Sequence, residues 1–168
     1  MPNGLNDEAL NPLEPLPRPA SVMTIGAHPD DAEFGAGATL SRWTASGATA
    51  VIVIATDGSK GSWDPHIDHA DLVARRRREQ VSAAAALGVH SVAWLGQPDG
   101  ELRHTPELRR AIASLIRKHR PNIVLTHDPW QRYQLHPDHR ATGMLAIDAV
   151  VAAREPRFYP DQGFEAHR

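Results

Sequence analysis

Two short segments of the chain combine histidines and carboxylates at spacings that suit metal chemistry. Residues 27–33 read AHPDDAE, and residues 136–139 read HPDH. Pro29 stiffens the first turn and removes a hydrogen-bond donor, so we expect His28 and Asp31 to converge on one cation while Asp30 points elsewhere. Together the two segments supply His, Asp and His ligands with room for water. That set is typical of a catalytic zinc site with an open position.

Each segment also has a simpler interpretation. In the first, Asp30 or Asp31 could cap the helix that follows. A cap needs only one carboxylate, however, and it leaves His28 unexplained. In the second, the pair of histidines could lie on the surface at a polar helix start. Two complementary ligand sets in one chain are less expected by chance than either alone, which favours the metal interpretation.

The composition restricts the chemistry further. The 168 residues include no cysteine and ten histidines, so a transition-metal site must be built from His and carboxylates. The formal net charge of −2 gives no field that would gather nucleic acid or anionic lipid. No apolar run approaches the roughly 18 residues of a membrane span, and we expect a cytoplasmic protein.

Strand-like and helix-like segments alternate along the chain. Residues 1–20 are rich in proline and are expected to form an arm outside the core. The expected strands are residues 21–27, 49–56, 91–95 and 122–126, and the expected helices are residues 32–46, 69–87, 106–120 and 138–153. This order predicts an α/β fold, a Rossmann-like three-layer sandwich with a mostly parallel sheet. In such sheets ligands bind beyond the carboxyl ends of the strands, and both histidine segments follow a strand.

The two segments carry a resemblance to a known family. AHPDDAEFGAGATL, followed far downstream by HPDHRATG, resembles the LmbE-like, or PIG-L, family of zinc-dependent N-deacetylases. The resemblance runs from about Met23 to the last residue. It implies that His28, Asp31 and His139 are metal ligands. The implied cofactor is Zn²⁺, although Fe²⁺, Co²⁺ or Ni²⁺ would also suit an N/O site.

The resemblance also implies roles for residues around the metal. Asp30 is implied to be the general base, His136 the electrophilic or acid partner, and Asp138 a residue that orients a catalytic histidine. Arg76 and Asp99 are implied to contact the substrate. Both have simpler interpretations: the arginine run at residues 75–78 could be a solvated helix face, and Pro-Asp-Gly at residues 98–100 is also a turn signal.

The chain departs from the family pattern in two places. Some members carry a tyrosine two residues before the HPDH segment, where this chain has Gln134. Relatives usually continue past the position of Arg168. We therefore expect residues 21–168 to form a deacetylase domain that lacks a C-terminal strand and helix.

The sequence thus predicts a hydrolase that removes an acetyl group from an N-acetylglucosamine-type amide, using metal-activated water and Asp30 as base. The expected partner is a small N-acetylated sugar conjugate, with a homo-oligomer left open and nucleic acid excluded. Three alternatives remain: a catalytically silent sugar-binding fragment, an amidase for a non-sugar metabolite, and a dinucleotide-binding module. The last has only a partial glycine motif, Gly35-x-Gly37, which falls inside the first helix.

Overall fold

Four strands rich in β-branched and apolar residues alternate with four helices along the chain. The structure is a computed structural model, and it describes residues 18–133 and 135–168. The elements are β1 (Ser21–Gly26), α1 (Asp31–Ala45), β2 (Thr49–Thr56), α2 (His69–Ala86), β3 (Ser91–Gln97), α3 (Pro106–His119), β4 (Ile123–Thr126), α4 (Pro137–Arg154) and the short 3₁₀ helix η2 (Pro160–Gln162).

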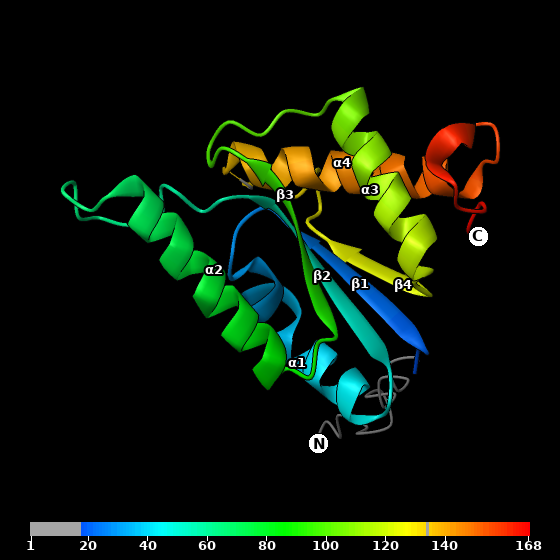
Figure 1. Cartoon of the computed structure of the whole chain (residues 1–168), viewed down its shortest axis with the longest axis horizontal. Coiled ribbons are helices and arrows are strands. Elements are labelled where there is room, and N and C mark those ends of the chain that lie inside the picture. Colours follow the sequence, from blue (N-terminus) through cyan, green and yellow to red (C-terminus); the bar gives the residue numbers. More distant parts are fainter. Residues whose placement is uncertain (1–17, 134) are drawn as a thin grey trace, which may run out of the picture.

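The strands form one parallel sheet in the order β3-β2-β1-β4 (Figure 1). The chain runs outward from β1 through β2 to β3, and then returns to place β4 on the other side of β1. The direction of winding therefore reverses between β1 and β4. In open parallel sheets this reversal opens a crevice at the carboxyl ends of the two strands on either side of it, here β1 and β4.

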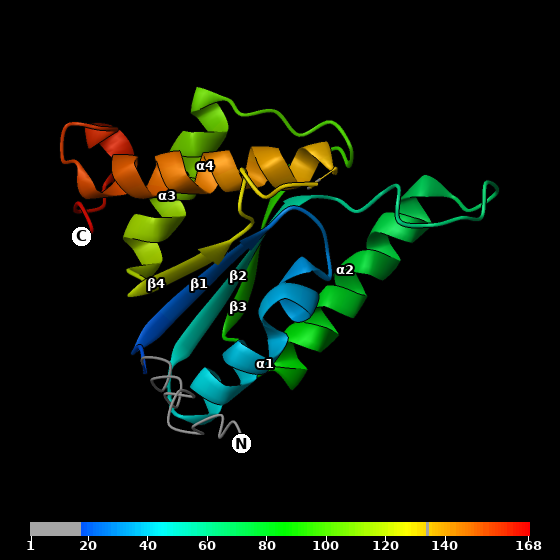
Figure 2. The ribbon, with the colours of Figure 1, turned by 180° about the vertical axis from the view of Figure 1, so that it is seen from behind.

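Helices cover both faces of the sheet, as the two opposite views show (Figures 1 and 2). On one face, α1 and α2 pack on alternate strand residues such as Val22 and Ile52. On the other face, α3 and α4 pack on their neighbours Met23 and Val53. These two apolar layers account for the near-continuous hydrophobic strands, because a parallel sheet is buried on both sides. Within the described residues no helix is long and apolar enough to span a membrane.

The predicted fold class is confirmed, and most element bounds agree within a residue or two. Thr105 caps α3, since its side chain accepts a hydrogen bond from the Leu108 N–H at 3.3 Å. The main difference is β3, which continues to Gln97 because it pairs with β2 as far as Thr56 across an irregularity in register. The expected proline-rich arm falls almost wholly outside the described residues, as does Gln134.

Candidate metal centre and active site

The candidate site is built from the loops at the carboxyl ends of β1 and β4, at the reversal of the sheet. After β1 the chain turns sharply through Asp30, which has φ of 103°, and enters α1 at Asp31. After β4 the loop begins at His127 and leads to His136, which precedes α4. The fold thus brings into contact two histidines, His28 and His139, that lie 111 positions apart in the chain.

Three side chains meet with their ligand atoms close together. His28 Nδ1 lies 3.2 Å from His139 Nε2 and 3.5 Å from Asp31 Oδ2. His139 Nε2 lies 3.2 Å from Asp31 Oδ1. Metal–ligand bonds of about 2.0–2.2 Å in a tetrahedral arrangement separate neighbouring ligand atoms by roughly 3.3 Å. The neighbouring donor atoms, one nitrogen from each histidine and the two oxygens of Asp31, have spacings close to this value.

A fourth residue, His127, joins this cluster and was not singled out by the sequence. Its Nε2 lies 3.1 Å from Asp31 Oδ2, and its ring stacks on His139 with centroids 4.1 Å apart. Asp31, His127 and His139 could themselves hold an ion. The signal in the sequence was its position, since His127 is the first residue after β4 and lies at the same edge of the sheet as His28.

Behind the cluster, two buried carboxylates hold the far side of the His28 ring. His28 Nε2 lies 3.2 Å from Asp138 Oδ2 and 3.2 Å from Asp99 Oδ1. Asp138 is fully buried and also accepts hydrogen bonds from the N–H groups of Gly100 at 2.6 Å and Leu102 at 3.1 Å. The two carboxylates therefore hold a proton on Nε2, and Nδ1 is the ring atom of His28 that faces Asp31 and His139.

The electrostatics of the cluster follow from this arrangement. Burial alone would lower the pKa of His28, but the hydrogen bonds and negative charges of Asp31 and Asp99 outweigh it and raise the pKa to about 10. Burial would raise the pKa of Asp31, but hydrogen bonds with His127, His139 and His28 hold it far below its ordinary value. Asp31 is consequently a carboxylate at all ordinary pH values, as a metal ligand must be.

His136 faces the same space in a different electrostatic state. Its ring meets the His28 ring edge-on with centroids 4.4 Å apart, and its Nδ1 accepts the Asp138 N–H at 3.2 Å. Burial and the nearby positive charge of His28 lower the pKa of His136. A neutral His136 whose Nδ1 accepts a hydrogen bond carries its proton on Nε2, so it can donate from that atom.

Asp30 points away from the cluster toward α2. Its Oδ2 accepts a hydrogen bond from Arg76 Nη2 at 2.7 Å, and Arg76 also pairs with Glu79 at 3.1 Å. The Asp30 side chain remains 45% exposed, so its carboxylate is open to a molecule in the site. Arg76 is only 20% exposed, and its contacts place it beside the site and not on a solvated helix face.

The groups surround a pocket of about 300 Å³. Its lining includes His28, Asp30, Asp31, Arg76, Asp99, His136 and His139, together with Lys60 from the loop after β2. Thus nearly all of the residues expected from the sequence border one cavity. Asp138 is the exception, since it lies behind His28.

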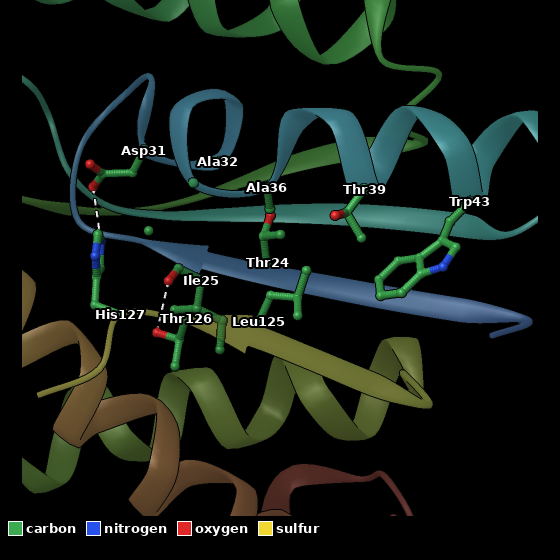
Figure 3. A pocket seen from close by; sticks show the side chains of 12 residues that line it. Thr24, Ile25, Asp31, Ala32, Ala36, Thr39, Trp43, Leu125, Thr126 and His127 are labelled. Atoms are coloured by element: carbon green, nitrogen blue, oxygen red, sulfur yellow. Dashed lines mark hydrogen bonds and ion pairs between the residues drawn. The ribbon is translucent and has the colours of Figure 1, made fainter. Parts of the chain in front are cut away.

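A second hollow, of about 330 Å³, lies on the other side of Asp31 and His127 (Figure 3). Its walls are mostly apolar. Trp43 of α1 and Leu125 of β4 line it, together with Thr39 of α1. Figure 3 shows the Asp31–His127 contact closing one end of this hollow. This pair therefore separates the polar pocket from an apolar groove at the edge of the sheet.

Comparison with known proteins gives several relatives of this chain. The diacetylchitobiose deacetylase of Thermococcus kodakarensis is 43% identical over 145 residues, which cover 86% of this chain and 54% of that protein. The 1D-myo-inositol 2-acetamido-2-deoxy-alpha-D-glucopyranoside deacetylase of Kineococcus radiotolerans is 31% identical, over 89% of this chain and 50% of that protein. The chain thus spans about half the length of the curated relatives it matches.

A solved structure of a deacetylase has a similar fold. The N,N'-diacetylchitobiose deacetylase from Pyrococcus horikoshii superposes with a TM-score of 0.86 at 35% identity, over 89% of this chain and 57% of that one. The family model described as PIG-L, GlcNAc-PI de-N-acetylase, matches residues 23–150, a span that includes both histidine segments. The chain therefore belongs to the PIG-L family of GlcNAc-PI de-N-acetylases.

Proposed function

We propose that this protein is a metal-dependent hydrolase that removes the acetyl group from an N-acetylglucosamine-type amide. The observation that carries the proposal is the meeting of His28, Asp31 and His139 at 3.2–3.5 Å, with the Asp30 carboxylate on the border of the same pocket. The relatives support it, because their names describe deacetylases of acetylated amino sugars. The reaction consumes one water molecule and yields acetate and a free amine.

His28, Asp31 and His139 would hold the ion. Two neutral imidazole nitrogens and one carboxylate form a donor set that suits Zn²⁺, and that also suits Fe²⁺, Co²⁺ or Ni²⁺. When bound, the ion supplies Lewis-acid chemistry, polarising the amide carbonyl and making water more acidic. His127 would keep the Asp31 carboxylate turned toward His139, since it contacts Oδ2 while His139 contacts Oδ1.

Asp30 would be the general base. Its neighbour Asp31 is committed to the metal cluster, whereas the Asp30 carboxylate lies on the pocket and is paired with Arg76. The guanidinium restrains the rotation of the Asp30 side chain, which favours a fixed direction for accepting a proton from the attacking water. The same proton can later be returned to the departing amine nitrogen, which balances the reaction.

His136 would stabilise the negative charge that develops on the amide oxygen. Its Nδ1 is occupied by the Asp138 N–H, so its Nε2–H is the group available to the substrate. A well-placed donor of this kind is worth about 2.7–4 kcal/mol in comparable sites. Asp138 would act indirectly, by holding Nε2 of His28 so that Nδ1 faces the metal cluster.

Arg76 and Asp99 would contribute to the binding of the sugar hydroxyls. Both line the pocket, and Arg76 is fixed by Asp30 and Glu79. Asp99 already contacts His28 at 3.2 Å, and its Oδ2 accepts the Lys60 N–H at 3.0 Å. A sugar hydroxyl bound by Asp99 would therefore lie directly beside the metal cluster.

The proposal is tested by metal analysis of the purified protein, combined with a free-amine assay on N-acetylated glucosamine conjugates. We expect one divalent ion per chain and amine release that a chelator abolishes and added metal restores. Bound metal and bound sugar without amine release would indicate a catalytically silent binding protein. Release of amine only from compounds other than sugars would indicate an amidase for another metabolite.

A further inference from the structure

The backbone of Asp30 lies in a conformation that most residues avoid. Its φ is 103° and its ψ is −21°, whereas φ is negative for nearly all residues with a side chain. Such a conformation is strained and persists only where its surroundings impose it. The Asp30 N–H donates to Gln80 Oε1 at 2.9 Å, and the Asp30 carbonyl accepts from the Phe34 N–H at 3.0 Å. A side chain from α2 therefore helps to impose the torsion.

Gln80 is unusual among the residues of α2. It is only 2% exposed, although the helix is mostly polar, and it is one of the largest fully buried side chains in the described structure. Its Nε2 donates to Glu33 Oε1 at 2.7 Å. An ionised carboxylate can only accept hydrogen bonds, so Nε2 must face Glu33 and Oε1 must face Asp30. The amide is thus fixed at both of its ends.

Gln80 lies one helical turn after Arg76, so the two share a face of α2. Arg76 holds the carboxylate of Asp30 at 2.7 Å, and Gln80 holds its main-chain N–H at 2.9 Å. The same face of one helix therefore fixes both the side chain and the backbone of this residue. A buried apolar residue would fill the space of Gln80 but could not accept the N–H.

We infer that Gln80 is a positioning residue for hydrolysis: by accepting the Asp30 N–H it fixes the backbone torsion that aims the Asp30 carboxylate at the substrate. This inference rests on the proposed function, in which Asp30 is the base. Without the acceptor, the N–H loses its partner and the torsion at Asp30 can relax. The carboxylate then meets the attacking water from a different direction.

Gln80→Leu keeps a similar volume and removes both hydrogen bonds. We expect kcat to fall about 10- to 100-fold, the range that a displacement of about 1 Å produces in a catalytic group. KM and the bound metal should stay within a factor of two, because the pocket and the ligands are not touched. Unchanged kcat in this variant, measured on the active wild-type background, would overturn the inference and leave the proposed function intact.

Exchanging the two polar partners gives a sharper test. Gln80→Glu alone places a carboxylate beside that of Glu33. Their repulsion should displace residue 80 from the Asp30 N–H, and kcat should fall. Adding Glu33→Gln places an amide donor at residue 33 opposite the new carboxylate at residue 80. The other oxygen of that carboxylate can still accept the Asp30 N–H. We expect the double variant to recover most of the kcat that Gln80→Glu loses. A side chain that only filled space would show no such recovery, and that result would contradict the inference.

The torsion itself can be tested without any activity. Glycine tolerates positive φ and alanine does not, so Asp30→Gly should unfold at a higher temperature than Asp30→Ala. In the Gln80→Leu background this difference should shrink, because the hydrogen bond from Gln80 no longer holds the torsion. An equal difference in both backgrounds would overturn the inference. This result can be read even if the wild type releases no amine, which would be a failure of the proposed function alone.

Discussion

Asp31 and Asp30 are chemically identical neighbours that occupy different environments. Asp31 lies within 3.5 Å of ring nitrogens of His28, His127 and His139. Asp30 instead pairs with Arg76 across the loop. The sharp turn at Asp30 separates the two carboxylates, so one can serve as a metal ligand while the other remains available for proton transfer.

This separation predicts opposite behaviour for two alanine variants. Asp30→Ala should lower kcat by about 10²- to 10⁴-fold, the usual contribution of a general base, while the metal content stays near that of the wild type. His139→Ala should lose the metal itself, because only two of the three proposed ligands remain. Elemental analysis of both proteins beside their amine-release rates checks this. Loss of metal from Asp30→Ala would reassign Asp30 as a ligand.

The raised pKa of His28 predicts a pH dependence for the metal-free protein. A histidine whose pKa rises from 6.5 to about 10 on folding stabilises the fold most below pH 6.5, and this stabilisation disappears as the pH passes 10. The melting temperature of chelator-treated protein should therefore fall between pH 6.5 and 10. The same titration of His28→Gln, which lacks the ionisable group, should be flatter. Equal slopes would show that His28 is not charged in the fold.

At the scale of the elements, α4 both carries residues of the site and supports the loop after β4. Its first residues carry Asp138 and His139, and its middle packs on the loop that carries His127. Gly143 makes that packing close, since a Cβ there would lie 2.5 Å from the His127 carbonyl oxygen and 2.9 Å from Pro129 Cδ. The helix can approach the loop this closely because residue 143 has no side chain.

Gly143→Ala should therefore push the loop away from the helix. We expect it to lower the free energy of unfolding by about 1–3 kcal/mol, as overpacking of a buried contact does, and to weaken metal binding through His127. Denaturant unfolding and a metal titration measure the two effects. Gly35→Ala in α1 is the matched control, because among the described residues no atom outside the backbone of α1 itself lies within 4 Å of the added Cβ. That variant should gain about 0.5–1 kcal/mol from helix propensity. A Gly143→Ala protein as stable as the control would contradict this account.

For the whole molecule, the alternation of apolar strands and helices made the fold predictable. The bounds of β2 match the β-branched run at residues 49–56, and a glycine with positive φ follows each of α1 and α2. The motif residues His28, Asp31, His136 and His139 could be placed at one edge, because parallel strands end together. The family resemblance supplied their separate roles, which the spacing alone did not.

Other features depend on contacts that no local pattern contains. His127 belongs to neither histidine motif, and the position of β4 beside β1 brings it to Asp31. The left-handed torsion of Asp30 and the contact with Gln80, 50 positions away, arise from the packing of α2 on the β1–α1 loop. Such long-range hydrogen bonds follow from strand order and helix packing, so the sequence pattern could not reveal them.

The central claim is that His28, Asp31 and His139 together hold one divalent ion. An anomalous difference map of crystals of the purified protein, recorded at the absorption edge of the metal found by elemental analysis, tests it most directly. We predict a single peak coordinated by these three residues. A peak held by Asp31, His127 and His139 without His28, or no peak in this cluster in crystals of a protein that contains metal, would contradict the claim.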